Sequence, residues 1–351
     1  MSRVDPGRSS GPDSGAVDDP RTRTTGADAR RGSLRPGERV QLTDPKGRLH
    51  ATTLAAGASF HTHRGYFRHE ELIGAPEGTV VTASGGTQYL ALRPLLADYT
   101  LSMPRGAAVV YPKDAGQVVT MGDIYPGAVV VEAGVGSGAL TLSLLRAVGD
   151  GGRLLSVERR EDFAAIARGN VEAFFGGAHP AWQLAVGDLA EVLAGLPEAS
   201  VDRVVLDMLA PWENVGPAAR VLAPGGVLTC YVATTTQLSR LAEDLRGDRR
   251  WTEPGAGGAR GRTGHLEGLA VRPDHRMIAH TGFLLTARRM AAGVAPPERT
   301  RRPAKGYGDD WTADDLGERA VSDKKVRRVR RDVGAAPDAG AGTAGPSSPT
   351  D

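Results

Sequence analysis

The chain has 351 residues, 40% of them hydrophobic, and a formal net charge of +2. This length allows one sizeable core with a small second domain, and the nearly balanced charge by itself indicates no class of partner. Cys230 is the single cysteine, which excludes a disulfide within the chain and favours a reducing cytoplasm. It lies in a strand-like apolar run, so we favour a role in the hydrophobic core over a role as a nucleophile. No apolar run approaches the ~18 residues of a membrane span, and no secretory leader is visible, so we predict a cytoplasmic protein without a membrane segment.

The N-terminal part of the chain falls into two stretches of different character. Residues 1–33 are rich in Arg, Asp, Gly, Ser and Thr and predict a disordered tail. Beyond them, the alternating runs at 38–44 and 48–54 flank a Pro-Lys-Gly turn, and the runs at 78–83 and 87–95 flank a Ser-Gly-Gly turn. Each pair of runs predicts a β-hairpin. We therefore predict a small β-domain over residues 34–100.

Two histidines, His61 and His63, stand at alternate positions between these hairpins. Such a pair can suggest a metal site, but no cysteine or cluster of acids lies nearby in the sequence. We favour a polar surface or an RNA-facing loop, and we predict no metal site.

The rest of the chain is organised around a glycine-rich segment. An apolar run at 128–131 ends in Glu132 and predicts a buried parallel strand. Gly134, Gly136 and Gly138 follow at alternate positions, then a helix-like run at 139–148 and a second strand-like run ending in Glu158. Strand, glycine loop, helix, strand and acid in this order predict half of a nucleotide-binding α/β sheet.

The details of this segment favour S-adenosylmethionine over a dinucleotide. Glu158 lies 20 residues after Gly138, where a carboxylate at a strand tip accepts hydrogen bonds from both ribose hydroxyls. The spacing G-x-G-x-G differs from the dinucleotide fingerprint G-x-G-x-x-G. Glu132, directly before the glycines, suits a cationic ligand with an amino-acid end better than a pyrophosphate. A dinucleotide site and a purely structural glycine turn remain the alternatives.

Alternation of helices and strands continues to about residue 290. Pro112 fits the first turn of a helix that would cover the cofactor cleft. After Glu158 we predict helices at 162–175, 216–222 and 234–246, and strands at 183–186, 201–206, 227–232, 266–271 and 282–287. This series predicts a seven-stranded, doubly wound, Rossmann-like α/β sheet with one antiparallel strand, over residues 101–290. Residues 291–351 predict a second disordered tail. Within it, the run at 324–331 has six basic residues in eight. This run could bind the phosphate backbone of RNA or could simply be a solvated tail, and the sequence leaves both interpretations open.

Two further acids end predicted strands of this sheet. Asp188 follows the third strand, where a carboxylate commonly accepts a hydrogen bond from the adenine amino group of the cofactor. Asp207 ends the fourth strand and is followed by Pro211 and Trp212. N-methyltransferases that act on bases often have a polar residue and a Pro-aromatic pair here, because the polar group holds the amino group of the target base. Asp207 as a simple turn cap is the alternative.

Four segments together, FHTHRG, YPKDAGQVV, EAGVGSGALTLSLL and LDMLAPW, resemble bacterial tRNA (adenine-58-N1)-methyltransferases. The similarity runs from about residue 37 to 289, in order and with matching spacing. It implies methyl transfer from S-adenosylmethionine to N1 of an adenine in the tRNA T loop, with the base turned out of the RNA. It also implies a small N-terminal β-domain and a homotetramer.

The same resemblance assigns residue roles. It implies Asp207 as the catalytic aspartate, next to the cofactor, and Tyr111 as the substrate-side tyrosine, which stacks on the target base; core packing is the alternative for Tyr111. Residue 163, which often contacts the cofactor adenine in the family, is Phe163 here and can only stack or pack. Together with the motif residues above, the expected cofactor contacts are Gln117, Glu132, Gly134, Gly136, Ser137, Gly138, Ala139, Leu140, Glu158, Phe163, Asp188 and Asp207.

One element departs from the family pattern. Relatives often carry an Arg-x-Trp element before the sixth strand, whereas this chain has Arg262-Thr263-Gly264-His265 after a glycine-rich stretch at 255–261 that we expect to be flexible. Two other functions stay open: a methyltransferase of the same fold acting on another substrate, and an inactive relative that only binds RNA. The LDMLAPW segment argues against a methyltransferase whose substrate is a small molecule. The presence of Asp207 and of the complete glycine loop argues against an inactive relative that only binds RNA.

Overall fold

A computed structural model describes residues 30–106 and 108–297. Most of the two predicted disordered tails, including the basic run at 324–331, therefore lies outside the described residues. Within these ranges, no helix combines the length and the apolar character needed to cross a bilayer.

The N-terminal part forms the small β-domain that the sequence predicts. Strands β1 (Arg39–Thr43) and β2 (Leu49–Thr53) pair antiparallel, as do β5 (Val80–Thr82) and β6 (Gln88–Leu92), in one sheet of order β2-β1-β6-β5. The histidine segment is a third hairpin, β3 (Ser59–Thr62) and β4 (Gly65–Arg68), followed by the short helix η2 (His69–Glu71). Tyr89 and Phe67 are buried at the centre of this domain, because their strands alternate buried and exposed positions.

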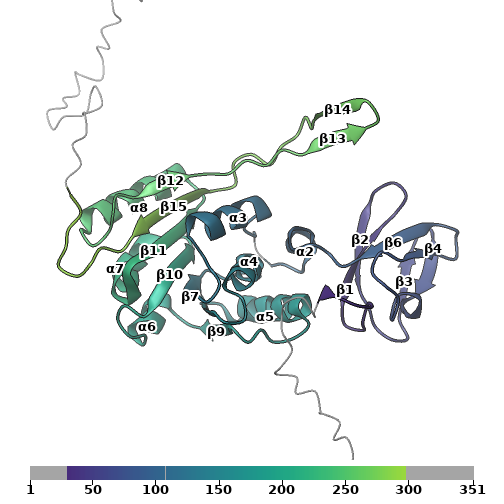
Figure 1. Cartoon of the computed structure of the whole chain (residues 1–351), viewed down its shortest axis with the longest axis horizontal. Helices are drawn as coiled ribbons and strands as arrows, with labels where there is room; N and C mark the ends of the chain where they lie inside the picture. Colours follow the sequence, from purple (N-terminus) through teal and green to yellow (C-terminus); the bar gives the residue numbers. More distant parts are fainter. Residues whose placement is uncertain (1–29, 107, 298–351) are drawn as a thin grey trace, which may run out of the picture. The chain divides into compact units, whose positions relative to one another are not determined.

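A seven-stranded sheet forms the larger part of the described chain (Figure 1). Its order is β12-β15-β11-β10-β7-β8-β9, and β15 runs antiparallel to both neighbours, as the sequence predicts for one strand. The strands are β7 (Val129–Ala133), β8 (Arg153–Glu158), β9 (Trp182–Val186), β10 (Val201–Asp207), β11 (Leu222–Val232), β12 (Gly255–Gly257) and β15 (Phe283–Arg288).

Four helices agree with the predicted ones to within one residue at each end: α4 (Ala139–Val148), α5 (Glu161–Phe175), α7 (Val215–Val221) and α8 (Thr235–Gly247). Helix α3 (Pro112–Met121) begins where Pro112 predicts. The sequence analysis predicted none of α2 (Leu96–Ser102), α6 (Leu189–Ala194) and η3 (Pro211–Asn214). Pro112 occupies the first turn of α3, where its missing N–H needs no partner, and the Thr234 side chain caps α8 by accepting a hydrogen bond from the Gln237 N–H.

The predicted strand at 266–271 is wrong. Gly268 adopts a left-handed backbone conformation, with φ of +53°, and splits this stretch into the hairpin β13 (Gly264–Glu267) and β14 (Ala270–Pro273). These two strands pair with each other in a separate two-stranded sheet. The seventh strand of the large sheet is instead β12, inside the glycine-rich stretch that we expected to be flexible. It pairs through its backbone with β15, which requires no side chains.

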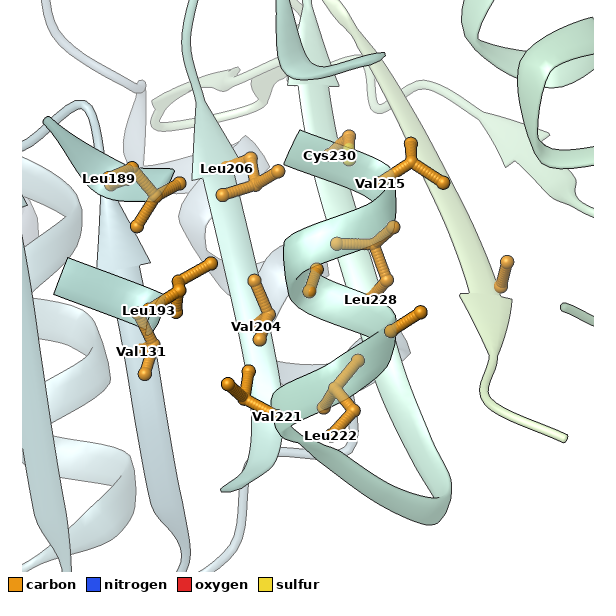
Figure 2. Packing of buried hydrophobic residues seen from close by; sticks show 14 of the residues in the cluster. Val131, Leu189, Leu193, Val204, Leu206, Val215, Val221, Leu222, Leu228 and Cys230 are labelled. Atoms are coloured by element: carbon orange, nitrogen blue, oxygen red, sulfur yellow. The ribbon is translucent and has the colours of Figure 1, made fainter. Parts of the chain in front are cut away.

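Apolar residues fill both faces of the large sheet. Val204, Leu206 and Leu228 point to one face, where helices α6, α7 and α8 pack (Figure 2). Val205 and Leu284 point to the opposite face, which is covered by α3, α4 and α5. Successive residues of a β-strand point to opposite faces of the sheet. We call the face that α3, α4 and α5 cover the α3–α4 face. Cys230 lies in the first cluster, and its burial raises the pKa of its thiol, so the predicted core role is confirmed.

Candidate active site

The glycine loop follows β7 and lies against the end of β10. Gly134, Gly136 and Gly138 all have left-handed backbone conformations, with φ of +85°, +53° and +84°. A Cβ atom at residue 134 would lie 1.7 Å from the Asp207 carbonyl oxygen, so only glycine permits this approach. The loop backbone and the predicted catalytic aspartate are therefore direct neighbours.

Asn170 and the segment before α3 hold the loop in place. The Asn170 side-chain amide donates to the Ser137 carbonyl oxygen at 2.9 Å and to the Pro104 carbonyl oxygen at 2.8 Å. Ser137 Oγ accepts a hydrogen bond from the Gly106 N–H at 3.3 Å. Ala139 and Leu140 then begin α4 with buried side chains, which leaves only their backbone groups for a ligand. The sequence reasoning missed Asn170, because its partners are 33 and 66 residues away.

Glu158 lies at the glycine loop, as its position at a strand tip predicts. One carboxylate oxygen accepts a hydrogen bond from the Gly136 N–H at 3.0 Å, and the other accepts from the Arg160 N–H at 3.0 Å. Each oxygen has a second lone pair, so the carboxylate retains the capacity to accept hydrogen bonds from two hydroxyls.

Phe163 and Asp188 lie on the neighbouring elements. Phe163 is almost buried near the start of α5, with the Arg160 guanidinium 3.9 Å from its ring centroid. Asp188 caps α6 by accepting a hydrogen bond from the Ala190 N–H at 2.9 Å, and it pairs with Arg159 at 2.7 Å. The backbone N–H of Ala190 and the Arg159 guanidinium lower the pKa of Asp188, so it is an ionised acceptor.

Glu132 is buried in the α3–α4 face directly before the glycine loop. Its carboxylate accepts hydrogen bonds from the Thr141 hydroxyl at 3.0 and 2.8 Å and from the Ser156 hydroxyl at 2.6 Å. Trp182 Nε1 donates to the Ser156 hydroxyl at 2.9 Å. Burial raises the pKa of Glu132 to about 7, against the opposing effect of the two hydroxyl donors. The hydroxyls of Thr141 and Ser156 thus orient this carboxyl, and sequence reasoning identified neither.

Asp207 lies beside Tyr231 at the ends of β10 and β11, where the two residues are paired in register. Burial raises the pKa of Asp207 to about 7. The Tyr231 hydroxyl donates to Asp114 Oδ2 at 3.1 Å, and burial raises its pKa to about 12. Tyr111 occupies the position directly before α3 without a capping side-chain hydrogen bond, and it is half-buried.

A polar cluster around Asp114 fixes the position of α3 and hence of Tyr111. Lys113 Nζ donates to Asp114 Oδ1 at 2.8 Å, to the Thr281 hydroxyl at 2.6 Å and to the Ala259 carbonyl oxygen at 2.8 Å. Thr281 Oγ1 also donates to Asp114 Oδ2, at 2.5 Å. The sequence motif YPKD points to this cluster, but its partners are 146 to 168 residues away.

Gln117 and the two histidines occupy other environments. Gln117 lines a cavity beside β12 together with Asp114 and Tyr231. His61 stacks on Tyr66, with ring centroids 5.4 Å apart, and His63 Nε2 accepts from Arg64 Nε. Among the described residues, no group of three or more His, Cys, Asp or Glu side chains is placed to hold a metal ion.

Known proteins match this chain over most of its described length. Residues 32–81 match the family model "TrmI-like N-terminal", and residues 88–254 match "tRNA methyltransferase complex GCD14 subunit". The tRNA (adenine(58)-N(1))-methyltransferase TrmI of Thermus thermophilus is 38% identical over 255 residues, which cover 72% of this chain and 96% of the relative. The tRNA (adenine(57)-N(1)/adenine(58)-N(1))-methyltransferase TrmI of Methanocaldococcus jannaschii is 31% identical over 63% of this chain and 84% of the relative.

Solved structures agree with the fold. A SAM-dependent O-methyltransferase from Thermotoga maritima superimposes with a TM-score of 0.69 and 29% identity, covering 78% of this chain and 99% of the other. The tRNA (m1A58) methyltransferase TrmI from Aquifex aeolicus gives a TM-score of 0.64 at 23% identity, covering 74% and 99%. The predicted α/β fold is thereby confirmed. On the strength of the Thermus thermophilus match, this chain belongs to the TrmI family of tRNA (adenine-58-N1)-methyltransferases.

Proposed function

We propose that this protein transfers a methyl group from S-adenosylmethionine to N1 of adenine 58 in the T loop of tRNA. One observation carries the proposal beyond the family match: the glycine loop approaches the Asp207 backbone so closely that only glycine fits at residue 134. A cofactor held by this loop lies next to the carboxylate that would hold the target base. In that function the protein works on tRNA in the cytoplasm.

The residues present suit S-adenosylmethionine. Glu158 would accept hydrogen bonds from the ribose hydroxyls, and Phe163 and Asp188 would hold the adenine end. The backbone of residues 134–140 would hold the middle of the ligand. The negative charge of Glu132, which its two hydroxyl donors orient, would favour the cationic amino-acid end. Gln117 lies on α3, and its predicted contact with the cofactor remains a proposal. When bound, the cofactor supplies an electrophilic methyl group on a sulfonium.

Asp207 has a positioning and electrostatic role in this reaction. Neutral adenine carries a lone pair and no proton at N1, so the reaction requires no strong general base. Ionised Asp207 accepts a hydrogen bond from the exocyclic amine and stabilises the positive charge that develops on the ring. The ring must be turned out of the RNA to reach this position, and Tyr111 stacks on it there. Correct placement for in-line attack supplies much of the rate.

We also propose that the protein assembles as a homotetramer. The hairpin β13–β14 carries three large apolar side chains in solvent: Leu266, Leu269 and Val271 are 77%, 104% and 66% exposed. Leu266 and Val271 face each other across the hairpin, so they share one surface. An exposed apolar surface of this kind favours burial against another copy of the chain.

Activity is tested by nucleoside mass spectrometry of unmodified tRNA incubated with the purified protein and S-adenosylmethionine. We expect 1-methyladenosine, mapped to position 58 by fragmentation. A methyl group found only on a ribose oxygen or on another base would assign this fold to a different substrate. Intact cofactor binding with no methylated nucleoside would support the RNA-binding alternative.

Replacing Asp207 with alanine is expected to reduce kcat by about 10²–10³-fold, because an electrostatic contact to the developing charge is lost. The Kd for S-adenosylmethionine, measured by calorimetry, is expected to change little. Single-turnover assays with Asp207→Ala and Asp207→Asn separate charge from hydrogen bonding. Normal turnover in Asp207→Ala would exclude the role assigned to this residue.

Activity is expected to depend on pH through Asp207. Its pKa is raised to about 7 by burial, and only the ionised carboxylate accepts the amine hydrogen bond. The value of kcat/KM for tRNA should therefore fall about tenfold per pH unit as the pH decreases below about 7. Glu132, whose pKa is also raised to about 7, is the competing group. A profile in which Glu132→Gln abolishes this decrease would transfer the titration to Glu132.

Self-association is tested by sedimentation of the double variant Leu266→Glu/Val271→Glu. We expect a tetramer for the unmodified protein and a smaller assembly for the variant, because burying two charged side chains opposes the contact. Leu49→Glu is the matched control, since Leu49 is 58% exposed in the small β-domain. A monomeric unmodified protein would contradict the homotetramer, and a tetrameric double variant would exclude this hairpin as the interface.

A further inference from the structure

A cavity of about 280 Å³ lies between helix α3 and the edge of the large sheet. Asp114, Gln117 and Met121 line it from α3, and Tyr231 and Leu284 line it from β11 and β15. The remaining wall is the backbone of residues 255–259, which includes strand β12, together with Gly282 and Thr286. The roles proposed above for Asp207 and Tyr111 use none of this space, and Gln117 is the one lining residue that is also an expected cofactor contact.

The cavity is open because β12 presents no side chains to it. Gly255 pairs with Thr286, and Gly257 pairs with Leu284. Directly opposed residues in an antiparallel pair point to the same face, and Leu284 points to the α3–α4 face. A Cβ atom at residue 257 would meet no atom within 4 Å, and one at residue 255 would meet only Thr286 Oγ1 at 3.8 Å. Side chains at these two positions would therefore extend into the cavity.

The backbone itself does not require glycine at these two positions. Neither Gly255 nor Gly257 is among the glycines with positive φ. Glycine weakens a strand interior, and it commonly marks a place where a ligand or another backbone approaches closely. The glycines of β12 thus maintain space for a ligand at a cost in local stability.

Tyr231 forms a wall of the cavity and is also the neighbour of Asp207. The two residues are in register on adjacent parallel strands, so their side chains point to the same face. The negative charge of Asp207 also contributes to the raised pKa of Tyr231, which reflects their proximity. A ligand in the cavity would therefore lie next to the target adenine that Asp207 is proposed to hold.

The chemistry of the walls favours a neutral aromatic ring. Lys113 neutralises Asp114, and the Tyr231 hydroxyl is held by Asp114, which orients the tyrosine ring. Leu284 and Met121 add apolar surface, and Gln117 exposes an amide that can both donate and accept. The volume is just below the ~300–1,000 Å³ of ordinary small-molecule sites, which suits one ring system. Single-stranded RNA bases are recognised in this manner, by stacking on aromatic side chains and hydrogen bonding at their edges.

We propose that this cavity binds the unstacked base of a nucleotide adjacent to the target adenine. That the RNA is tRNA rests on the proposed function. That a nucleobase binds in the cavity is inferred from the shape and the lining of the cavity itself. The site would then read one neighbour of the methylated base.

The test combines a filled cavity with a missing base. Gly257→Leu fills the cavity, and Ala256→Leu is the matched control, because Ala256 pairs with Leu285 and points to the opposite face. The RNAs are a T-arm hairpin and two versions in which the nucleotide on one side of the target adenine is abasic. Binding is measured by fluorescence anisotropy in the presence of S-adenosylhomocysteine.

We expect one abasic RNA to bind the unmodified protein about 5- to 150-fold more weakly, which corresponds to the ~1–3 kcal/mol of one stacked base. Gly257→Leu should bind the complete RNA more weakly by a similar factor, with no further loss on that abasic RNA. Ala256→Leu should behave as the unmodified protein, and all three proteins should have equal cofactor affinity. Met121→Ala provides a second variant that leaves β12 unchanged, with a smaller loss on the same RNA.

Equal binding of all three RNAs by the unmodified protein would overturn the proposal, and so would the absence of any RNA binding. It would also be overturned if Gly257→Leu bound the abasic RNA more weakly than the complete RNA by the same factor as the unmodified protein does. A changed sedimentation mass of Gly257→Leu with unchanged RNA binding would also overturn it and assign the cavity to another copy of the chain. Failure to methylate adenine 58 with the binding pattern intact would contradict the proposed function and leave the nucleobase site standing.

Discussion

The close approach of the glycine loop to the end of β10 is the constraint on which the rest of the site depends. A single Cβ atom at residue 134 would overlap the Asp207 carbonyl oxygen. Strands β7 and β10 are neighbours in a parallel sheet, so their carboxyl ends meet at one edge, and the glycine backbone removes the last steric separation. A ligand on the loop and a carboxylate on the neighbouring strand are then brought together by two neighbouring strands of the sheet.

The four carboxylates around this edge divide into two groups by their electrostatic environment. Glu158 and Asp188 accept hydrogen bonds from backbone N–H groups. Glu132 and Asp207 are buried, and burial raises both pKa values to about 7. A cation bound nearby lowers the pKa of such groups and favours their ionised forms. This division agrees with a cofactor that has a polar nucleoside at one end and positive charge at the other.

Helix α3 connects this edge to distant parts of the chain. Lys113 and Asp114 bind Thr281 and Ala259, which lie close to β15 and on the connection towards the hairpin β13–β14. Buried polar clusters with every member paired are rigid, and loss of one partner leaves an unsatisfied charge. Tyr111, at the start of the same helix, is thereby positioned by residues far away in the sequence. The cavity beside β12 is lined by the same helix, so it and the N-terminal end of α3 share one support.

The sequence by itself determined the features that depend on local geometry. The glycine spacing predicted the loop, Pro112 predicted the start of α3, and the positions of Glu158, Asp188 and Asp207 at the ends of strands were predicted from the apolar runs before them. Such features follow from backbone sterics and from the periodicity of apolar residues within one segment. The tertiary structure alone decided which segment completes the sheet, because β12 pairs through its backbone and its glycines carry no apolar pattern. It also decided the hydroxyl donors of Glu132, the partners of Asp114 and the cavity beside β12, since these arise where segments far apart in the chain pack together.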